Sequence, residues 1–474
     1  MKRNGSIAGV LVLLGAVGCS GEEADDRTSL LMGATFSTTG VSAVSTWGNA
    51  FDLAARDASE GLKEAGFPTG KHLKFDTAMV DTSNKVEITV AGATKMVKEQ
   101  GAKMVINGTS ADTVALGKLD YDTDTSNDLA VPIVCVACSS PALHNPTATN
   151  ADPAVQGADR NEQKWIFGLA MSSVPQSQVL WNILVDSTPS GNIPGDLNGD
   201  GVVKISTIAL DDAFGTGFQG AMKTVVDKAT EMGITNGTVK YEETKHPKDA
   251  DLSSYDWSGA LELLTDNKTG DTEDVAPDVL IEFTFPQFSL ALVKAYTGSV
   301  PFFHTHSMRE STVVLAAENT LEGQDGTSYL PSDGESGRMF DARFRDVFRT
   351  ARESQWDSDV YDGGFLFGLA AVKATMGMDD PSAVTGAQIR DAMLTLNNRD
   401  GELIRIGPSE FAKAAKIIAE GGEINYDGAS GPCDFNDYGR ATNRISHWRV
   451  EGGQAKDLAV YDCVSDSATC PKMP

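Results

Sequence analysis

The chain has 474 residues, a formal net charge of −27 at pH 7 and 41% hydrophobic residues. Nucleic acid and anionic lipid surfaces repel such an acidic protein, so the composition excludes both as expected partners. The length and the apolar content allow two or three domains, each with a core of its own.

The N-terminus predicts export. Lys2 and Arg3 precede an apolar run over residues 7–18, which is shorter than the ~20 residues that span a bilayer as a helix. Small residues stand directly before Cys19, as in a lipobox. We therefore expect residues 1–19 to be a lipoprotein signal peptide with Cys19 as the lipidated residue, and residues 20–28 to be a tether. In the alternative, the protein is simply secreted and Cys19 pairs elsewhere.

Strands and helices then alternate along the chain. Apolar residues recur at helical spacing from Trp47 to Ala65, between the strand-like runs 29–36 and 73–81. Further strands are expected over 103–107 and 131–136, with helices between them. This order predicts a parallel, doubly wound α/β sheet.

The same pattern restarts after an insert at residues 187–201. Strands are expected over 203–210, 239–243, 278–283 and 300–306, with helices over 214–232, 257–264 and 288–296. Two such lobes leave a cleft where the carboxyl ends of two sets of strands face each other. That geometry binds a ligand without any catalytic residue.

The cysteines suit an exported protein, in which disulfides persist. Cys463 and Cys470 bracket a short C-terminal loop and are expected to pair. Cys135 and Cys138 are close enough to pair or to remain buried thiols. The odd number leaves at least one thiol, for which Cys433 is our candidate.

Two motifs suggest cofactors. Asp196, Asn198 and Asp200 occupy the first, third and fifth positions of a calcium loop, but Thr207 replaces the bidentate glutamate at the twelfth. The loop is either a calcium site or a solvated turn rich in Asp and Asn. Gly215, Gly217 and Gly220 form a literal GxGxxG.

The dinucleotide interpretation of these glycines is disfavoured by their surroundings. Asp211 and Asp212 separate the first glycine from the strand end near Leu210, and two carboxylates would repel a pyrophosphate. We therefore expect no cofactor, and a structural calcium ion at residues 196–200 stays the alternative.

Six segments in order resemble type I periplasmic binding proteins, the family of the leucine/isoleucine/valine-binding protein. "DDAFGTGFQGAMK" is similar to the family's D-x-x-(Y/F)-G-x-G turn. The other segments are "STTGVSAVSTWGNAFDLAARDA", "MVINGTSADTVAL", "VPIVCVACSSPAL", "YDGGFLFGLAAVKA" and "INYDGASGPCDFNDYGRA".

The resemblance implies an α/β fold of two Rossmann-like lobes joined by a three-crossover hinge. The first lobe is expected over residues 29–168 and 323–428, and the second over 169–322 and 429–474 with the C-terminal tail. The glycines at 215, 217 and 220 would then allow a tight turn and close packing of helix on sheet.

The implied function is solute capture for an ABC importer. A small polar solute (an amino acid, an amide or a small carboxylate) would be enclosed by hinge closure and passed to a membrane permease. The protein would be a monomer, lipid-anchored in the periplasm or on the cell surface. A sensory module with the same fold is the alternative. An enzyme is disfavoured, because the sequence has no GxSxG, P-loop or HExxH motif.

The resemblance also implies ligand-binding residues in the first lobe. Trp47 would cover an apolar ligand, or else belong to the core. Ser110 would bind a carboxylate, but Ala111 replaces the second serine of the family's pair; Thr113 would substitute for it or cap the helix. The backbone of Ala137 and Cys138 and the hydroxyl of Ser139 would complete this side, although Ser139 also suits a turn.

From the second lobe, Phe214 and Phe285 match lining positions or are ordinary core residues. His306 matches the position where amino-acid binders of this family carry an acidic residue for the ligand ammonium. Either the ligand lacks an ammonium or Asp212 or Asp112 supplies the charge. His304 and His306 are two apart on a strand, but no third metal ligand is visible in the sequence.

Overall fold

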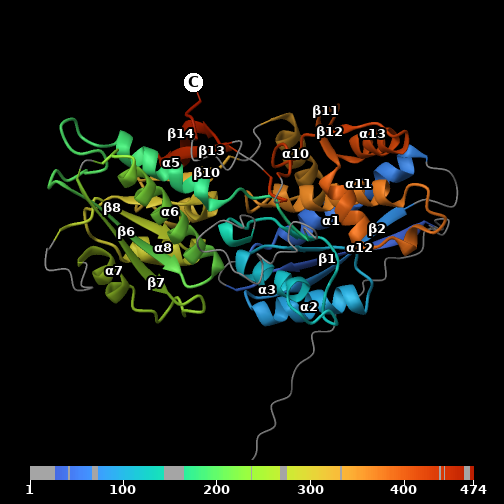
Figure 1. Ribbon diagram of the computed structural model, residues 1–474, viewed down its shortest axis with the longest axis horizontal. Coiled ribbons are helices and arrows are strands. Elements are labelled where there is room, and N and C mark those ends of the chain that lie inside the picture. Colours follow the sequence, from blue (N-terminus) through green and yellow to red (C-terminus); the bar gives the residue numbers. More distant parts are fainter. Residues whose placement is uncertain are drawn as a thin grey trace, which may run out of the picture.

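The computed structural model describes residues 27–40, 43–66, 73–143, 165–235, 237–266, 275–330, 334–436, 439–441, 444–463 and 470–473. The predicted signal peptide, Cys19 and most of the tether lie outside these ranges. Two separate α/β lobes are present, and their segments alternate along the chain (Figure 1).

The first lobe is built on a five-stranded sheet with the order β2-β1-β3-β4-β5. Every pairing in it is parallel, and β1 runs beside β2 over its whole length. The central strands are apolar and buried, as expected for a parallel sheet covered on both faces. The strands are β1 (Thr28–Phe36), β2 (Leu73–Asp81), β3 (Val105–Asn107), β4 (Ile133–Cys135) and β5 (Ile166–Gly168).

Helices from two distant parts of the chain cover this sheet. The early helices are α1 (Trp47–Ala65), α2 (Val86–Lys98), α3 (Ser110–Tyr121) and the short η1 (Pro141–Leu143). The later ones are α10 (Glu335–Phe348), α11 (Asp357–Thr375), η3 (Pro381–Ala383), α12 (Gly386–Leu394) and α13 (Pro408–Ala419), with the pair β11 (Asn397–Ile404) and β12 (Ile424–Tyr426). Helix α1 packs against α11 and α13, which joins the two parts (Figure 1).

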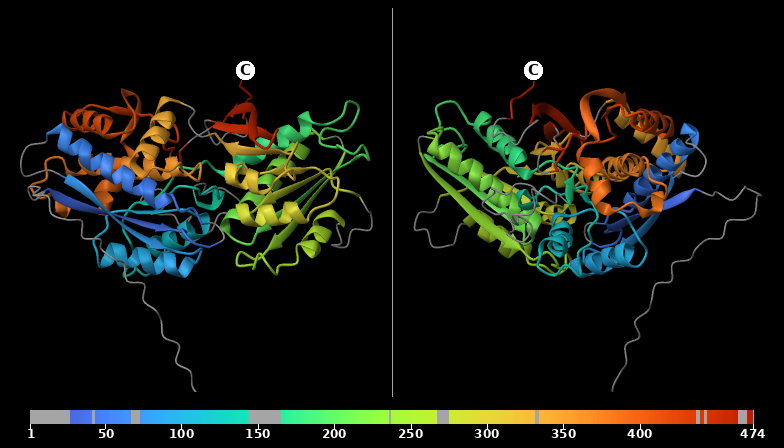
Figure 2. Two further views of the ribbon diagram at one scale, coloured as in Figure 1. Left: turned by 180° about the vertical axis from the view of Figure 1, so that it is seen from behind. Right: turned by 45° about the vertical axis from the view of Figure 1, so that its right-hand side comes forward.

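The second lobe is built on a seven-stranded sheet with the order β14-β13-β10-β9-β8-β6-β7. Strands β13 and β14 are antiparallel, and both join late from the C-terminal part of the chain (Figure 2). The strands are β6 (Val202–Leu210), β7 (Thr238–His246), β8 (Val279–Phe283), β9 (Phe302–His304), β10 (Asp325–Tyr329), β13 (Arg444–Val450) and β14 (Ala455–Asp462). The helices are α5 (Ser173–Asp186), α6 (Ala213–Glu231), α7 (Trp257–Asp266), α8 (Pro286–Ala295), η2 (His306–Met308) and α9 (Ser311–Ala316).

In the described part of the chain the elements change lobe three times: between β5 and α5, between β10 and α10, and between β12 and β13. One expected boundary is wrong. The first lobe does not resume at residue 323, because β10 pairs with β9 and β13 and so belongs to the second lobe.

The expected boundary at residue 428 is also too early. Ala429 and Ser430 donate backbone hydrogen bonds to Asp362 in α11, and Arg440 forms a bridge with Gly168 at the end of β5. The last crossing therefore follows residue 441. Within the described ranges, no helix is both long enough and apolar enough to cross a bilayer.

Candidate functional site

A cavity of about 230 Å³ lies between the lobes. Three parts of the chain line it, which meet only in the folded protein. The first lobe contributes Ala43, Val44, Trp47, Gly108, Thr109, Ser110 and Ala137; the second contributes Phe214, Phe285, Pro286, Gln287, His306, Ser307, Glu310 and Val313; the segment before α11 contributes Glu353, Ser354 and Trp356.

The first-lobe wall is formed where β3 ends and α3 begins. Thr109 caps α3, because its hydroxyl accepts a hydrogen bond from the Asp112 N–H at 3.2 Å. Gly108 lies directly under Trp47, and a Cβ at this position would overlap the indole ring. Close approach of the ring to the backbone therefore requires glycine here.

Trp47 belongs to the core and also lines the cavity. It is only 4% exposed and meets Phe36 edge to face with ring centroids 5.4 Å apart, so it belongs to the hydrophobic core. It also lines the cavity, and its indole Nε1 is buried without a hydrogen-bond partner among the described residues.

The second-lobe wall begins where β6 turns into α6. The Asp212 carboxylate caps α6 by accepting hydrogen bonds from the N–H groups of Phe214 and Gly215, both at 2.9 Å. A Cβ on Gly215 would overlap the backbone of Leu210, and one on Gly217 would lie 2.7 Å from Ser140 Oγ of the first lobe. Gly215 thus allows close packing of α6 on β6, as expected, whereas Gly217 allows close packing of α6 on the first lobe.

This turn holds Phe214 against Phe285. The two rings stack with centroids 5.7 Å apart and planes 12° apart. Phe285 is the residue before α8 and is partly exposed, whereas Phe214 is buried. Together they form an apolar surface of the cavity.

His306 stands in an aromatic surround and is uncharged. Ring centroids of Phe214, Tyr329 and Trp356 lie 5.1–5.7 Å from its own. Burial lowers the pKa of His306 to about 3. It therefore supplies no charge of either sign at neutral pH.

Its tautomer follows from Gln176. The Gln176 amide donates to the backbone oxygen and the hydroxyl of Thr327, so its Oε1 is left to accept from His306 Nδ1 at 3.2 Å. The proton is then on Nδ1, and Nε2 is an acceptor without a partner among the described residues. His306 thus offers an acceptor at the edge of the cavity.

Two acidic residues that the sequence did not single out line the cavity. Glu310 Oε1 accepts hydrogen bonds from Ser354 Oγ and from the Gln355 N–H, both at 3.1 Å. Burial raises the pKa of Glu310 to about 7, although these hydrogen bonds lower it. Glu353 is exposed, and one of its carboxylate oxygens accepts hydrogen bonds from the N–H and the hydroxyl of Ser45.

Asp112 and Asp212, the expected substitutes for an acidic residue, do not line this cavity. They face a much smaller neighbouring cavity with Ala111 and Lys248. Asp112 accepts hydrogen bonds from the hydroxyls of Thr89 and Thr109, both at 2.8 Å, and burial raises the pKa of Asp212 to about 6. The Asp212 carboxylate caps α6, and the Asp112 carboxylate links α3 to Thr89 in α2.

The predicted site residues divide into two groups. Six line the main cavity: Trp47, Ser110, Ala137, Phe214, Phe285 and His306. Ala111, Thr113, Cys138 and Ser139 do not. Thr113 is buried behind the wall, where its hydroxyl donates to Asn107 Oδ1 at 2.7 Å. Ligand contacts of any of these residues stay predictions.

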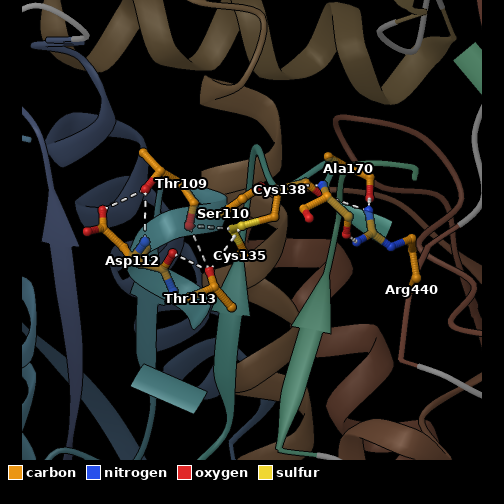
Figure 3. The surroundings of a disulfide bond; sticks show 10 residues. Thr109, Ser110, Asp112, Thr113, Cys135, Cys138, Ala170 and Arg440 are labelled. Atoms are coloured by element: carbon orange, nitrogen blue, oxygen red, sulfur yellow. Dashed lines mark hydrogen bonds between the residues drawn. A yellow bond between two sulfur atoms is a disulfide. The ribbon is translucent and has the colours of Figure 1, made fainter. Parts of the chain in front are cut away.

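A disulfide between Cys135 and Cys138 closes the loop after β4, beside Ala137 (Figure 3). The buried Arg440 donates to the backbone oxygens of Cys138 at 2.6 Å and Ala170 at 2.7 Å (Figure 3). It also donates to the backbone oxygen of Ser140. Arg440 therefore ties the loop after β4 to the first crossover.

The remaining cysteines are placed as follows. Cys463 and Cys470 form a disulfide near the C-terminus. Cys433 is a buried thiol, whose sulfur lies 3.6 Å from Asp362 Oδ2.

The side chains of both candidate metal-binding motifs, the calcium-like loop and the histidine pair, make hydrogen bonds within the protein. The Asp196 carboxylate accepts hydrogen bonds from the N–H groups of Gly199 and Gly201, and the side chains of Asn198 and Asp200 each accept one from the second residue after them. His304 Nε2 lies 2.5 Å from Gln324 Oε1. Within the described ranges, no three His, Cys, Asp or Glu side chains are grouped so that they could hold a metal ion.

No family model and no curated protein matches the chain. Solved structures do match it. A solute-binding protein of an ABC transporter from Rhodopseudomonas palustris BisB5, in complex with 3,4-dihydroxybenzoic acid, has 15% identity and a TM-score of 0.60, with 92% of this chain and 98% of that chain covered.

Two further structures are similar to the same extent. A leucine-binding protein from Thermotoga maritima has 14% identity and a TM-score of 0.58, with 91% of this chain and 98% of that chain covered. A branched-chain amino acid substrate-binding protein from Streptococcus pneumoniae, in complex with isoleucine, has 14% identity and a TM-score of 0.58, with 94% and 100% covered. The expected fold is thereby confirmed.

Proposed function

We propose that this chain, which has the type I periplasmic-binding fold, captures a small polar solute outside the cytoplasm and delivers it to the permease of an ABC importer. The solved structures of this fold described above include substrate-binding proteins of ABC transporters with small molecules bound. In this proposal Cys19 carries the lipid that keeps the protein at the membrane surface.

One observation carries the proposal: the walls of the cavity come from both lobes. Trp47 and Ser110 belong to the first lobe, whereas Phe214 and His306 belong to the second. A solute that touches both walls stabilises the closed arrangement of the lobes, because the open arrangement offers it only one wall. Ligand binding and lobe closure are thus coupled, and a permease can recognise the closed form.

The polar groups of the cavity support binding rather than catalysis. The hydroxyls of Thr109 and Ser354 donate to the carboxylates of Asp112 and Glu310, so they orient these carboxylates. The neutral His306 donates to an amide oxygen rather than activating a hydroxyl. Such positioned groups suffice to select a ligand.

A thermal-shift screen tests the proposal. We expect at least one compound in a panel of amino acids, amides, amines and small carboxylates to raise the melting temperature. Only the folded state binds, so a ligand at a hundredfold excess over its Kd adds about 2.7 kcal/mol to the free energy of unfolding. A panel in which no compound binds contradicts solute capture.

The variant Phe285→Ala locates the binding site. Because Phe285 is partly exposed at the cavity, we expect the melting temperature without ligand to change little. The affinity for the best compound should fall by about tenfold, as expected for the loss of a stacked aromatic wall. Unchanged affinity would show that the solute binds elsewhere.

A further inference from the structure

We propose that the solute is an organic cation, an amine or a quaternary ammonium compound with an apolar body and no carboxylate, whose charged group binds at Glu310. This inference rests on the proposed function and names its substrate class.

The charges around the cavity are of one sign. Glu310 and Glu353 line it, and neither lysine nor arginine does so among the described residues. A carboxylate that loses water on lobe closure is unfavourable unless a positive charge accompanies it. Because the protein supplies no such charge in the cavity, the ligand is the source that remains.

The Glu310 carboxylate is held in place but not neutralised. Oε1 is fixed by Ser354 Oγ and the Gln355 N–H, whereas Oε2 accepts no hydrogen bond from the described residues. Two arginines in the vicinity of Glu310 have other carboxylate partners: Arg352 Nε lies 2.9 Å from Asp341 Oδ1, and Arg309 Nη2 lies 2.8 Å from Asp457 Oδ2. Both arginines line a second cavity, which shares Glu310, Glu353 and Ser354 with the first.

The rest of the lining suits the body of a cation. Trp47, Trp356 and the stacked pair of Phe214 and Phe285 present aromatic surface, which attracts a positive charge through the faces of the rings. Next to them, the Nε2 atom of the neutral His306 is an acceptor for an ammonium N–H group.

The opposite end of the cavity does not favour an anion. Asp112 lies in the first turn of α3, and its charge offsets the positive end of this helix. Ala111, which replaces the second serine of the expected carboxylate-binding pair, faces the smaller cavity. A ligand carboxylate would therefore meet Ser110 without a compensating charge in the main cavity, because Lys248 lines the smaller one.

Matched compounds test the inference. The first arm contains isopentylamine, phenethylamine and choline; the second contains leucine and phenylalanine; the third contains isocaproate and hydrocinnamate. Apart from choline, which adds a quaternary ammonium group to the first arm, the three arms share their apolar bodies and differ in their charged groups. Calorimetry on the full chain should give the lowest Kd in the amine arm, by at least about tenfold over the corresponding amino acid.

The variant Glu310→Gln keeps the shape and the acceptor for Ser354 and Gln355, and it should raise the Kd of the amine by at least about tenfold. Glu420→Gln, which removes an exposed carboxylate after α13, is the matched control and should leave the Kd unchanged.

Tighter binding of the amino acids or carboxylates, or an unchanged amine Kd in Glu310→Gln, overturns the inference while solute capture stands. Absence of binding in every arm overturns both.

Discussion

The two walls of the cavity differ in what they offer a ligand. The first-lobe wall consists of backbone and hydroxyls at the start of α3, covered by Trp47. The wall from the second lobe and the segment before α11 is aromatic and acidic, with Phe214, Phe285 and Glu310. The organic cation that we propose would be oriented between such walls, because its charged group and its apolar body both find partners on the second wall.

The walls also differ in how rigidly they are built. Gly215 packs against the backbone of Leu210, which cannot move aside without disturbing β6. Gly108 packs against the ring of Trp47, a side chain that can shift without breaking strand hydrogen bonds. Replacing each glycine with alanine therefore compares a clash with backbone atoms, at Gly215, with a clash with a side chain, at Gly108.

The largest expected effect is that of Gly215→Ala. The added methyl group overlaps the Leu210 backbone, so the free energy of unfolding should fall by about 3 kcal/mol or more. Denaturant unfolding monitored by circular dichroism measures this loss. Gly217→Ala, whose added methyl group has side-chain atoms of Ser140 and Pro141 as its nearest neighbours, is the control and should lose less. Equal losses would show that the Leu210 contact is not the cause.

Gly108→Ala should have a smaller effect on stability, about 1–2 kcal/mol, because the Trp47 ring can move. Its effect on binding should be clearer, since a displaced ring no longer covers the ligand. We expect a shift in tryptophan emission together with a weaker affinity in the thermal-shift screen. An unaltered emission spectrum with full affinity would contradict the placement of Trp47 over Gly108.

The smallest expected effect is a pH dependence that arises on the second wall only. Burial raises the pKa of Glu310 to about 7, so the carboxylate is protonated below that pH in the free protein. A cation favours the ionised form; amine affinity should therefore rise with pH through about 7 and level off above it. Calorimetry from about pH 5.5 to about pH 8.5 measures this profile.

The other groups near Glu310 set the limits of that profile. Asp357, with a pKa raised by burial to about 6, adds to the slope at the acidic end, whereas His306, with a pKa of about 3, stays neutral throughout. Glu353 is exposed to solvent. In Glu310→Gln the rise through about pH 7 should disappear; its persistence would assign the titration to another group.

The family resemblance, rather than periodicity or spacing, predicted Phe214 and Ser110. The structure places both at the cavity, each where a strand turns into a helix. Glu310 was missed because it lies four residues beyond the position that the family resemblance indicated. Strand β10 was missed because "DGTSY" is short and polar, and only its neighbours β9 and β13 define it.

The segment before α11 shows a more general limit. Glu353 reaches Ser45 from more than three hundred positions away, and Trp356 reaches His306 from a different lobe segment. No periodicity or capping signal marks such meetings, since they depend on how the crossovers place the lobes. These residues became visible only in three dimensions.

The guanidinium group of Arg440 has a consequence for the way the molecule opens. It donates hydrogen bonds to carbonyl oxygens of the loop after β4 and of the first crossover between the lobes. Its own backbone pairs with Gly168 and lies shortly before the last crossover. Arg440 thus links segments next to two of the three crossovers. We expect the lobes to rotate about this point when they open, rather than to slide past each other, so the cleft should open first at the edge farthest from Arg440.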